Sequence, residues 1–289
     1  MIDLQHANTE FQSYLNAYDQ NDPKVKLKII HTKGVVKCAE EISSRMGLSE
    51  EDKSLAKLIA LLHDIGRFEQ LRRFDSFEPN TMDHAAYGAD LLFGSGKLIR
   101  RFIKEDTWDD IIRVSIARHS DFKLDKISDS RTLLHARLIR DADKLDNCRV
   151  KLEDSMELLL GVTEAEAGRE AISDKIWETC MKKQAVLSSD RKSRMDYWVS
   201  YVAYFFDINF PETFSIIQER DYAARIIHRI PYKNPDTRIK METLCRMMQE
   251  YIAHRIDFIM YQPENPWSLD RGMNGVSLSY HNNYLEIFY

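Results

Sequence analysis

The chain has 289 residues, and 44% of them are hydrophobic, which is enough to bury a sizeable core in one large domain or a domain with an extension. It has 41 Lys and Arg residues and 46 Asp and Glu residues, and the net charge of -5 argues against a protein whose main task is to bind the nucleic-acid backbone. No apolar run approaches the roughly 20 residues of a membrane-spanning helix, so we expect no membrane insertion.

The cysteines and the N-terminal residues indicate the cellular compartment in which the protein is expected. The four cysteines are widely scattered and form no CxxC motif, which favours free thiols over a zinc finger or a dithiol site. The first residues lack the basic and apolar segments of a signal peptide. We therefore expect a soluble, cytoplasmic protein.

Glycine and proline are scarce, with 10 and 7 residues, and apolar positions recur at helical spacing, so the chain is predicted to be all-α. A short helix is expected near residues 9–18. The next helix has Asp22 as its N-cap, Pro23 at its first position and Gly47 at its end. His31 lies on the apolar stripe of this helix.

The stretch LIALLHDIGRFEQ is the centre of the pattern. Residues 55–62 are apolar almost all the way round, which predicts a buried helix. Its last turn delivers His63 and Asp64, and Gly66 is expected to end it. A carboxylate at the end of a buried helix needs a partner, and a metal ion suits an adjacent imidazole and carboxylate.

Three more helices are predicted in the first half of the chain. Asp83 is expected to cap a short helix that starts at His84, and Thr107 is expected to cap one that runs to His119. A long helix is expected over about residues 131–153, and it carries the motif RDADKLD. Each of these helices therefore brings a potential metal ligand.

Beyond residue 160 the chain is rich in aromatic residues and poor in paired His and Asp. We place a soft boundary there, between a helical unit at 1–160 that carries these potential ligands and an extension at 161–289, and leave open whether the chain forms one body. Residues 263–289 alternate in polarity, which hints at a strand, a hairpin or an arm packed on the body or on a neighbouring subunit. The helices expected in this half are 163–187, 193–208, 211–229 and 236–261.

The candidate ligands share one property: each histidine lies on or beside an apolar stripe of a different helix. Helical bundles build metal sites from such inward-pointing residues. A single buried histidine is more often a hydrogen-bonded core residue, but an adjacent His-Asp pair at a helix end favours a metal site. In RDADKLD the helical period permits either Asp141 or Asp143 as a ligand. The histidines and the paired aspartate are His31, His63, Asp64, His84 and His119.

Three segments of this pattern resemble the HD superfamily of metal-dependent phosphohydrolases. They are IIHTKGV with His31, LLHDIGR with His63 and Asp64, and IRDADKLD with Asp143, and they span roughly residues 20–150. The resemblance implies an all-α HD-domain helical bundle with a C-terminal helical extension. It also implies that these four residues hold one metal ion.

Two further histidines match the subgroup with six ligands and two metals: His84 in DHAAYGADLL and His119 in IARHSD. In that subgroup Asp64 would bridge to a second ion held by these two histidines. The implied cofactor is one or two divalent ions, with Mn, Fe, Co, Ni, Zn and Mg all open. Ser120 follows His119 and no Gly-Tyr-Pro signature comes after it, so the chain departs from the cyclic-dinucleotide phosphodiesterase branch.

The resemblance implies a hydrolase that cleaves a nucleotide or related phosphoester by attack of a metal-activated hydroxide. Two alternatives remain: a di-iron oxygenase of the HD type, which uses similar ligands, and a nucleotide-binding regulatory module without turnover. The expected partner is a small phosphorylated substrate, with a nucleotide favoured, and homo-oligomerisation is open.

Beside Asp64, two residues are candidates for substrate chemistry. Arg67 can clamp a phosphate or be a surface residue, and Lys144 can contact phosphate or form an ordinary ion pair. Glu69 can act as a base or be a solvated carboxylate. His135 has no apolar neighbours that mark it as inward. If Asp143 is the ligand, Asp141 and Asp146 are expected to be ion-pair partners or acceptors that orient the ligands.

Overall fold

The computed structural model describes residues 2–78 and 80–260, and within these ranges it contains helices and no strand. The predicted all-α bundle with a helical C-terminal part is therefore confirmed. None of the helices in these ranges combines the length and the apolar character that a bilayer span needs. The expectation for residues 263–289 falls outside the described residues.

Three long helices form the frame: α2 (Pro23–Arg45), α8 (Ser130–Glu153) and α15 (Pro235–Met260). The shorter helices of the first half are α1 (Leu4–Leu15), α3 (Glu50–Leu62), α4 (Ile65–Phe74), α5 (His84–Phe93), α6 (Ile99–Phe102) and α7 (Asp109–Arg118). Those of the second half are α9 (Met156–Leu160), α10 (Glu164–Ala167), α11 (Asp174–Met181), α12 (Arg194–Ala203), α13 (Pro211–Glu219) and α14 (Tyr222–Ile227), with 3-10 turns η1 (Ser188–Asp190) and η2 (Tyr204–Asp207).

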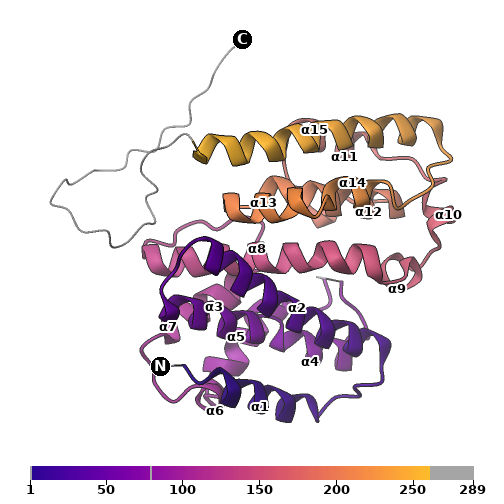
Figure 1. The fold of residues 1–289 in the computed structure, drawn as a ribbon. Helices are drawn as coiled ribbons and strands as arrows, with labels where there is room; N and C mark the ends of the chain where they lie inside the picture. The colour runs from indigo at the N-terminus through magenta and orange to yellow at the C-terminus, as the bar shows by residue number, and fades with distance from the viewer. Residues whose placement is uncertain (1, 79, 261–289) are drawn as a thin grey trace.

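Helix α8 crosses the middle of the molecule (Figure 1), with α1–α7 on one side and α11–α15 on the other. On the first side α8 packs against α2, α3 and α7, and on the second side against α13 and α14. Buried apolar side chains form one cluster that includes residues from both sides. A residue on α8 therefore faces either the first half of the chain or the second, according to its position around the helix.

Local capping chemistry sets several helix starts as predicted. The Asp22 carboxylate accepts hydrogen bonds from the backbone N–H groups of Lys24 and Val25, at 2.8 and 3.0 Å, and begins α2. Asp83 does the same for α5, which runs over the predicted residues. Helix α3 buries its apolar run on all sides, as the absence of a polar face predicts.

Other boundaries differ from the prediction. Helix α1 starts at Leu4, where Asp3 caps it, so the expected range 9–18 was wrong. Thr107 does not cap α7, which begins at Asp109 without a side-chain cap. The block 163–187 is broken into α10 and α11, and the block 211–229 into α13 and α14. Asp221 separates α13 from α14 and adopts a left-handed conformation with φ 49°.

The chain turns between α3 and α4 at His63 and Asp64, and Gly66 lies inside α4 rather than ending a helix. The expected role of Gly66 was therefore wrong, and its physical role is close packing. A Cβ atom on Gly66 would lie 2.3 Å from the carbonyl oxygen of His84 and 2.8 Å from the backbone nitrogen of Gly88. The missing side chain lets α4 and α5 touch, which brings His84 beside Asp64.

Candidate metal centre

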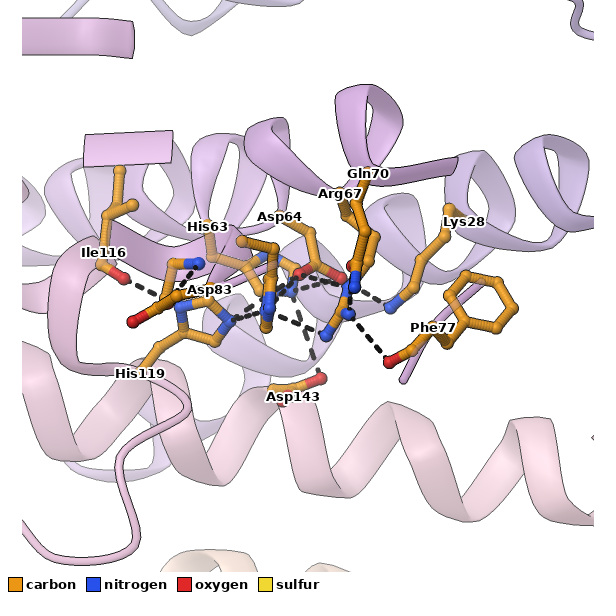
Figure 2. A network of polar contacts seen from close by, with 12 residues as sticks. Lys28, His63, Asp64, Arg67, Gln70, Phe77, Asp83, Ile116, His119 and Asp143 are labelled. Carbon is orange, nitrogen blue, oxygen red and sulfur yellow. Dashed lines mark hydrogen bonds and ion pairs between the residues drawn. The ribbon is translucent and has the colours of Figure 1, made fainter. Parts of the chain in front are cut away.

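The predicted ligands come from four helices (α2, α5, α7 and α8) and from the turn between α3 and α4, and they converge at one place between α8 and the helices of the first half. Two groups of three have potential ligand atoms that all lie within 4.8 Å of one another: His31, His63 and Asp64, and Asp64, His84 and His119. All five side chains are buried. Figure 2 shows His63, Asp64 and His119 directed toward one another, with Asp143 reaching the cluster from α8. Asp64 belongs to both groups.

Two of the histidines are held in the orientation that a metal ligand requires. The Nδ1 atom of His63 lies 2.7 Å from the carbonyl oxygen of Ala60, and Nδ1 of His119 lies 2.8 Å from that of Ile116. A carbonyl oxygen only accepts, so each Nδ1 carries the proton and donates it. Each Nε2 atom therefore presents a lone pair to the centre of the cluster.

His31 is held between two carboxylates of α8. Its Nδ1 lies 2.8 Å from Oδ2 of Asp146, and its Nε2 lies 2.9 Å from Oδ1 of Asp143. Burial and the charge of Lys28 oppose protonation of His31, but both carboxylates favour it, and the pKa of His31 is raised. A Cβ atom on Gly34 would lie 1.9 Å from Oδ1 of Asp146, so only glycine leaves room for this carboxylate.

Asp146 is predicted to set the metal affinity of His31. Replacing Asp146 with Asn keeps the shape but removes the charge behind Nδ1, so we expect metal affinity to fall by about 10- to 100-fold. Competition with a chromophoric chelator measures this. Asp196→Asn is the matched control, since it alters a buried carboxylate in the capping box at the start of α12, which accepts from Ser173 and Ser193, and it should keep full affinity. Equal affinities of Asp146→Asn and wild type would contradict the role given to Asp146.

The carboxylate of Asp64 divides its two oxygens between the two groups. Its Oδ2 lies 3.5 Å from Nε2 of His63, and its Oδ1 lies 3.2 Å from Nε2 of His84 and 3.6 Å from Nε2 of His119. Lys28 reaches Oδ2 at 2.5 Å. A carboxylate shared in this way has the geometry to join two cation sites.

At His63, His84 and Asp64 the protonation states already suit metal binding. Burial lowers the pKa of His63 to about 4, and burial together with Arg67 lowers the pKa of His84 to about 3, so both rings are neutral at neutral pH. Burial opposes ionisation of Asp64, but Lys28 and the histidines hold the pKa of its carboxyl well below the usual value. Neutral imidazole and ionised carboxylate are the forms that bind metal.

The donor set fits divalent ions. Nε2 of His63 is fully buried and has no hydrogen-bond partner among the described residues, which is costly unless a further group binds it. Ligand atoms bonded to one ion at about 2.1 Å lie roughly 3.0–3.4 Å apart at octahedral or tetrahedral angles. The spacings of 2.9 Å for His31 to Asp143 and 3.1 Å between Nε2 of His84 and of His119 are close to that range.

A comparison of the sequence with known protein families finds one match that contains these ligand groups. Residues 29–148 match the HD domain family. This part of the chain is an HD domain. An HD domain is typically a metal-dependent hydrolase, and the two His/Asp groups described above lie inside the matched segment. The six-ligand subgroup stays a prediction. No curated protein matches the chain, and no solved structure does.

Within the HD domain, Arg67 is not a surface residue. Its side chain is 14% exposed, and its Nη2 lies 2.9 Å from Nε2 of His84, while its Nη1 donates to Gln70 and to the carbonyl oxygen of Phe77. Its Nε lies 3.7 Å from Oδ1 of Asp64. Arg67 is therefore fixed at the cluster, and its contact with substrate phosphate stays a prediction.

Lys144 and Glu69 have partners away from the histidines. Lys144 forms an ion pair with Asp207 at 2.9 Å, as expected if it is an ordinary ion-pair residue. Its contact with substrate phosphate stays a prediction. Glu69 is buried and pairs with Arg72 and Arg73, both at 2.5 Å, so it is not a solvated carboxylate. These partners lie on its own helix α4, which explains how the carboxylate can be buried.

The two faces of α8 separate Asp141 from Asp143. Asp143 faces His31 and His63, whereas Asp141 is fully buried against the segment that starts α13. His135 is buried as well, which corrects the expectation that nothing marks it as inward. Its partner is Asp52, with Nε2 3.0 Å from Oδ1, so a carboxylate on α3 rather than an apolar stripe determines its orientation.

Three further residues shape the HD domain site and were not predicted from the sequence. Lys28 lies one helical turn before His31, and this spacing could have indicated that both side chains lie on the same face of the helix. Asn147 lies one turn after Asp143 and donates to its Oδ1 at 3.0 Å. Arg140 is buried and donates at 3.2 Å to the carbonyl oxygen of His119, a tertiary contact that no local pattern indicates.

Proposed function

We propose that this protein is a divalent-metal phosphohydrolase that cleaves a nucleotide or a related phosphoester. The observation that carries the proposal is the sharing of Asp64 by two buried ligand groups, with the cations Lys28 and Arg67 at the same carboxylate. Divalent ions bound there would supply an activated water and neutralise charge on the phosphoryl oxygens. The chain would hold them with His31, His63, Asp64, His84, His119 and Asp143.

The protein's own groups have two tasks in this proposal. The backbone carbonyls of Ala60 and Ile116 keep the proton on Nδ1 of His63 and His119, so that the opposite nitrogens stay free to bind. Lys28 is 15% exposed and Arg67 14%, so a phosphoryl oxygen that arrives from solvent can contact both of them beside Asp64. The 26% exposure of Asp143 shows that solvent reaches this end of the cluster.

Mixed imidazole and carboxylate ligands suit Mn, Fe, Co, Ni and Zn, with Mg also in the proposal. The expected substrate is a small phosphorylated compound in free solution. A planar guanidinium next to the ligand cluster favours phosphate chemistry, because it matches the geometry of phosphate oxygens.

Metal removal and reloading test the proposal. We expect elemental analysis of the purified full-length chain to find divalent metal, and chelation to abolish hydrolysis of phosphomonoesters and phosphodiesters in a nucleotide panel. Reloading with each of the six metals in turn should restore activity with at least one. The His63→Ala, Asp64→Ala double variant is the matched background for contaminating phosphatases.

Three outcomes would count against it. Equal, slow hydrolysis by wild type and the double variant would remove the enzymatic claim and leave a nucleotide-binding regulator. Iron-dependent consumption of oxygen that stops in anaerobic buffer, with no phosphoester turned over, would favour an oxygenase. A chain that retains no divalent metal under any loading condition would remove both.

A further inference from the structure

Lys151 is a buried cation without a carboxylate partner. Its side chain lies on α8 and is 7% exposed, yet among the described residues no Asp or Glu oxygen lies within 4.0 Å of its ammonium group. Its contacts are a long hydrogen bond of 3.5 Å to Oδ1 of Asn147 and the ring of Tyr201, whose centroid is 4.0 Å from Nζ. Burying a charge is costly unless it is paired, so this arrangement calls for an anion.

The position of Lys151 relative to the metal centre follows from α8. Asp143, Asn147 and Lys151 are four residues apart and share one face of the helix. Asn147 donates to Oδ1 of Asp143 and accepts from Lys151. Two hydrogen bonds and the width of one amide therefore separate the ammonium from the Asp143 carboxylate, a distance of at most about 9 Å.

Electrostatics agrees with this placement. Burial lowers the pKa of Lys151 to about 8, the charge of Lys28 lowers it further, and that of Asp143 raises it. The side chains of Lys151, Asn147 and Tyr204 line a cavity of about 10 Å³. That is room for about one water-sized group, such as a single oxygen atom of a phosphoryl group.

We propose that Lys151, Asn147 and Tyr201 form a second anion subsite, which binds one oxygen of a phosphoryl group that is not cleaved. The inference rests on the proposed function, because the cleaved group lies at the metal centre. The substrate class is then a compound with two or more phosphoryl groups, such as a nucleoside diphosphate or triphosphate. Tyr201 contributes a half-buried ring that shields the ammonium from water and strengthens its attraction for the anion.

Equilibrium binding tests the subsite without turnover. Isothermal titration of the full chain as purified would compare methylenediphosphonate with methylphosphonate, which differ by the second phosphoryl group. We expect the diphosphonate to bind at least 10-fold more tightly to wild type, and Lys151→Met to remove most of this difference. Lys151→Arg keeps the charge and should retain most of it. The Met variant should unfold at the same or a higher temperature than wild type, because an unpaired buried charge has been removed.

Kinetics provides the second measurement. For an active protein, Lys151→Met should raise KM for a nucleoside diphosphate about 10-fold with little change in kcat, and leave a monophosphate unaffected. Equal binding of the two phosphonates to wild type, or an unchanged difference in Lys151→Met, would overturn the subsite. Hydrolysis of phosphoesters without this selectivity would overturn the subsite alone. Retained selectivity in binding, with no hydrolysis, would leave the subsite standing and overturn the proposed function.

Discussion

Asp64→Asn is expected to bind no metal and to lose at least about a thousandfold in activity, the largest functional effect in the chain. The two oxygens of Asp64 face different histidine groups, so one substitution weakens both cation sites. The amide has one acceptor oxygen instead of two and carries no charge. Elemental analysis of the purified variant, together with its turnover of the best substrate, measures both effects.

His119→Ala is the informative comparison for Asp64→Asn. It removes a ligand of one group only, because Nε2 of His119 lies 3.6 Å from Oδ1 of Asp64 and belongs to the group with His84. For a protein that binds one ion in each group, we expect this variant to retain about one ion. If Asp64→Asn keeps the metal content of wild type, the shared carboxylate is not a ligand. If His119→Ala loses all metal, the two groups do not bind independently.

Asp141→Ala is expected to cause the largest loss of stability, about 3–5 kcal/mol, or roughly 10 °C in Tm. The Asp141 carboxylate is fully buried and accepts from the backbone N–H groups of Asn209 and Phe210, at 3.0 and 2.9 Å, and from the hydroxyl of Thr213 at 3.0 Å. Without it, these donors remain in the core without an acceptor, and α8 loses a polar attachment to α13. Chemical denaturation and a thermal melt measure the change.

Thr213→Val is the control for this prediction. It removes one donor and keeps the shape and the carboxylate, so we expect a loss of only about 1 kcal/mol. The folded fraction of Asp141→Ala should also keep its metal, because Asp141 faces α13 and not the histidines. Loss of metal with unchanged stability would reverse the assignment of the two faces of α8.

The HD domain was predictable from the sequence because its signals are local. Asp22 and Asp83 set the starts of α2 and α5 through hydrogen bonds within three residues, and the apolar run before His63 predicts a buried helix without reference to any other part of the chain. Where the local signal was weak, as at Thr107 and in residues 163–187, the predicted boundaries were wrong. The ligand set itself remains a prediction for metal analysis to test.

The chain alone therefore determined the helical class, the HD motif and the kinds of side chain available to bind a metal. Only the tertiary structure decided that Asp143 faces the histidines while Asp141 faces α13, because helical period permits either until the neighbours of α8 are in place. It also decided that Lys28 lies against Asp64 and that Lys151 is buried without a counter-charge. These are contacts between helices far apart in sequence, and their energies depend on burial, which no local pattern encodes.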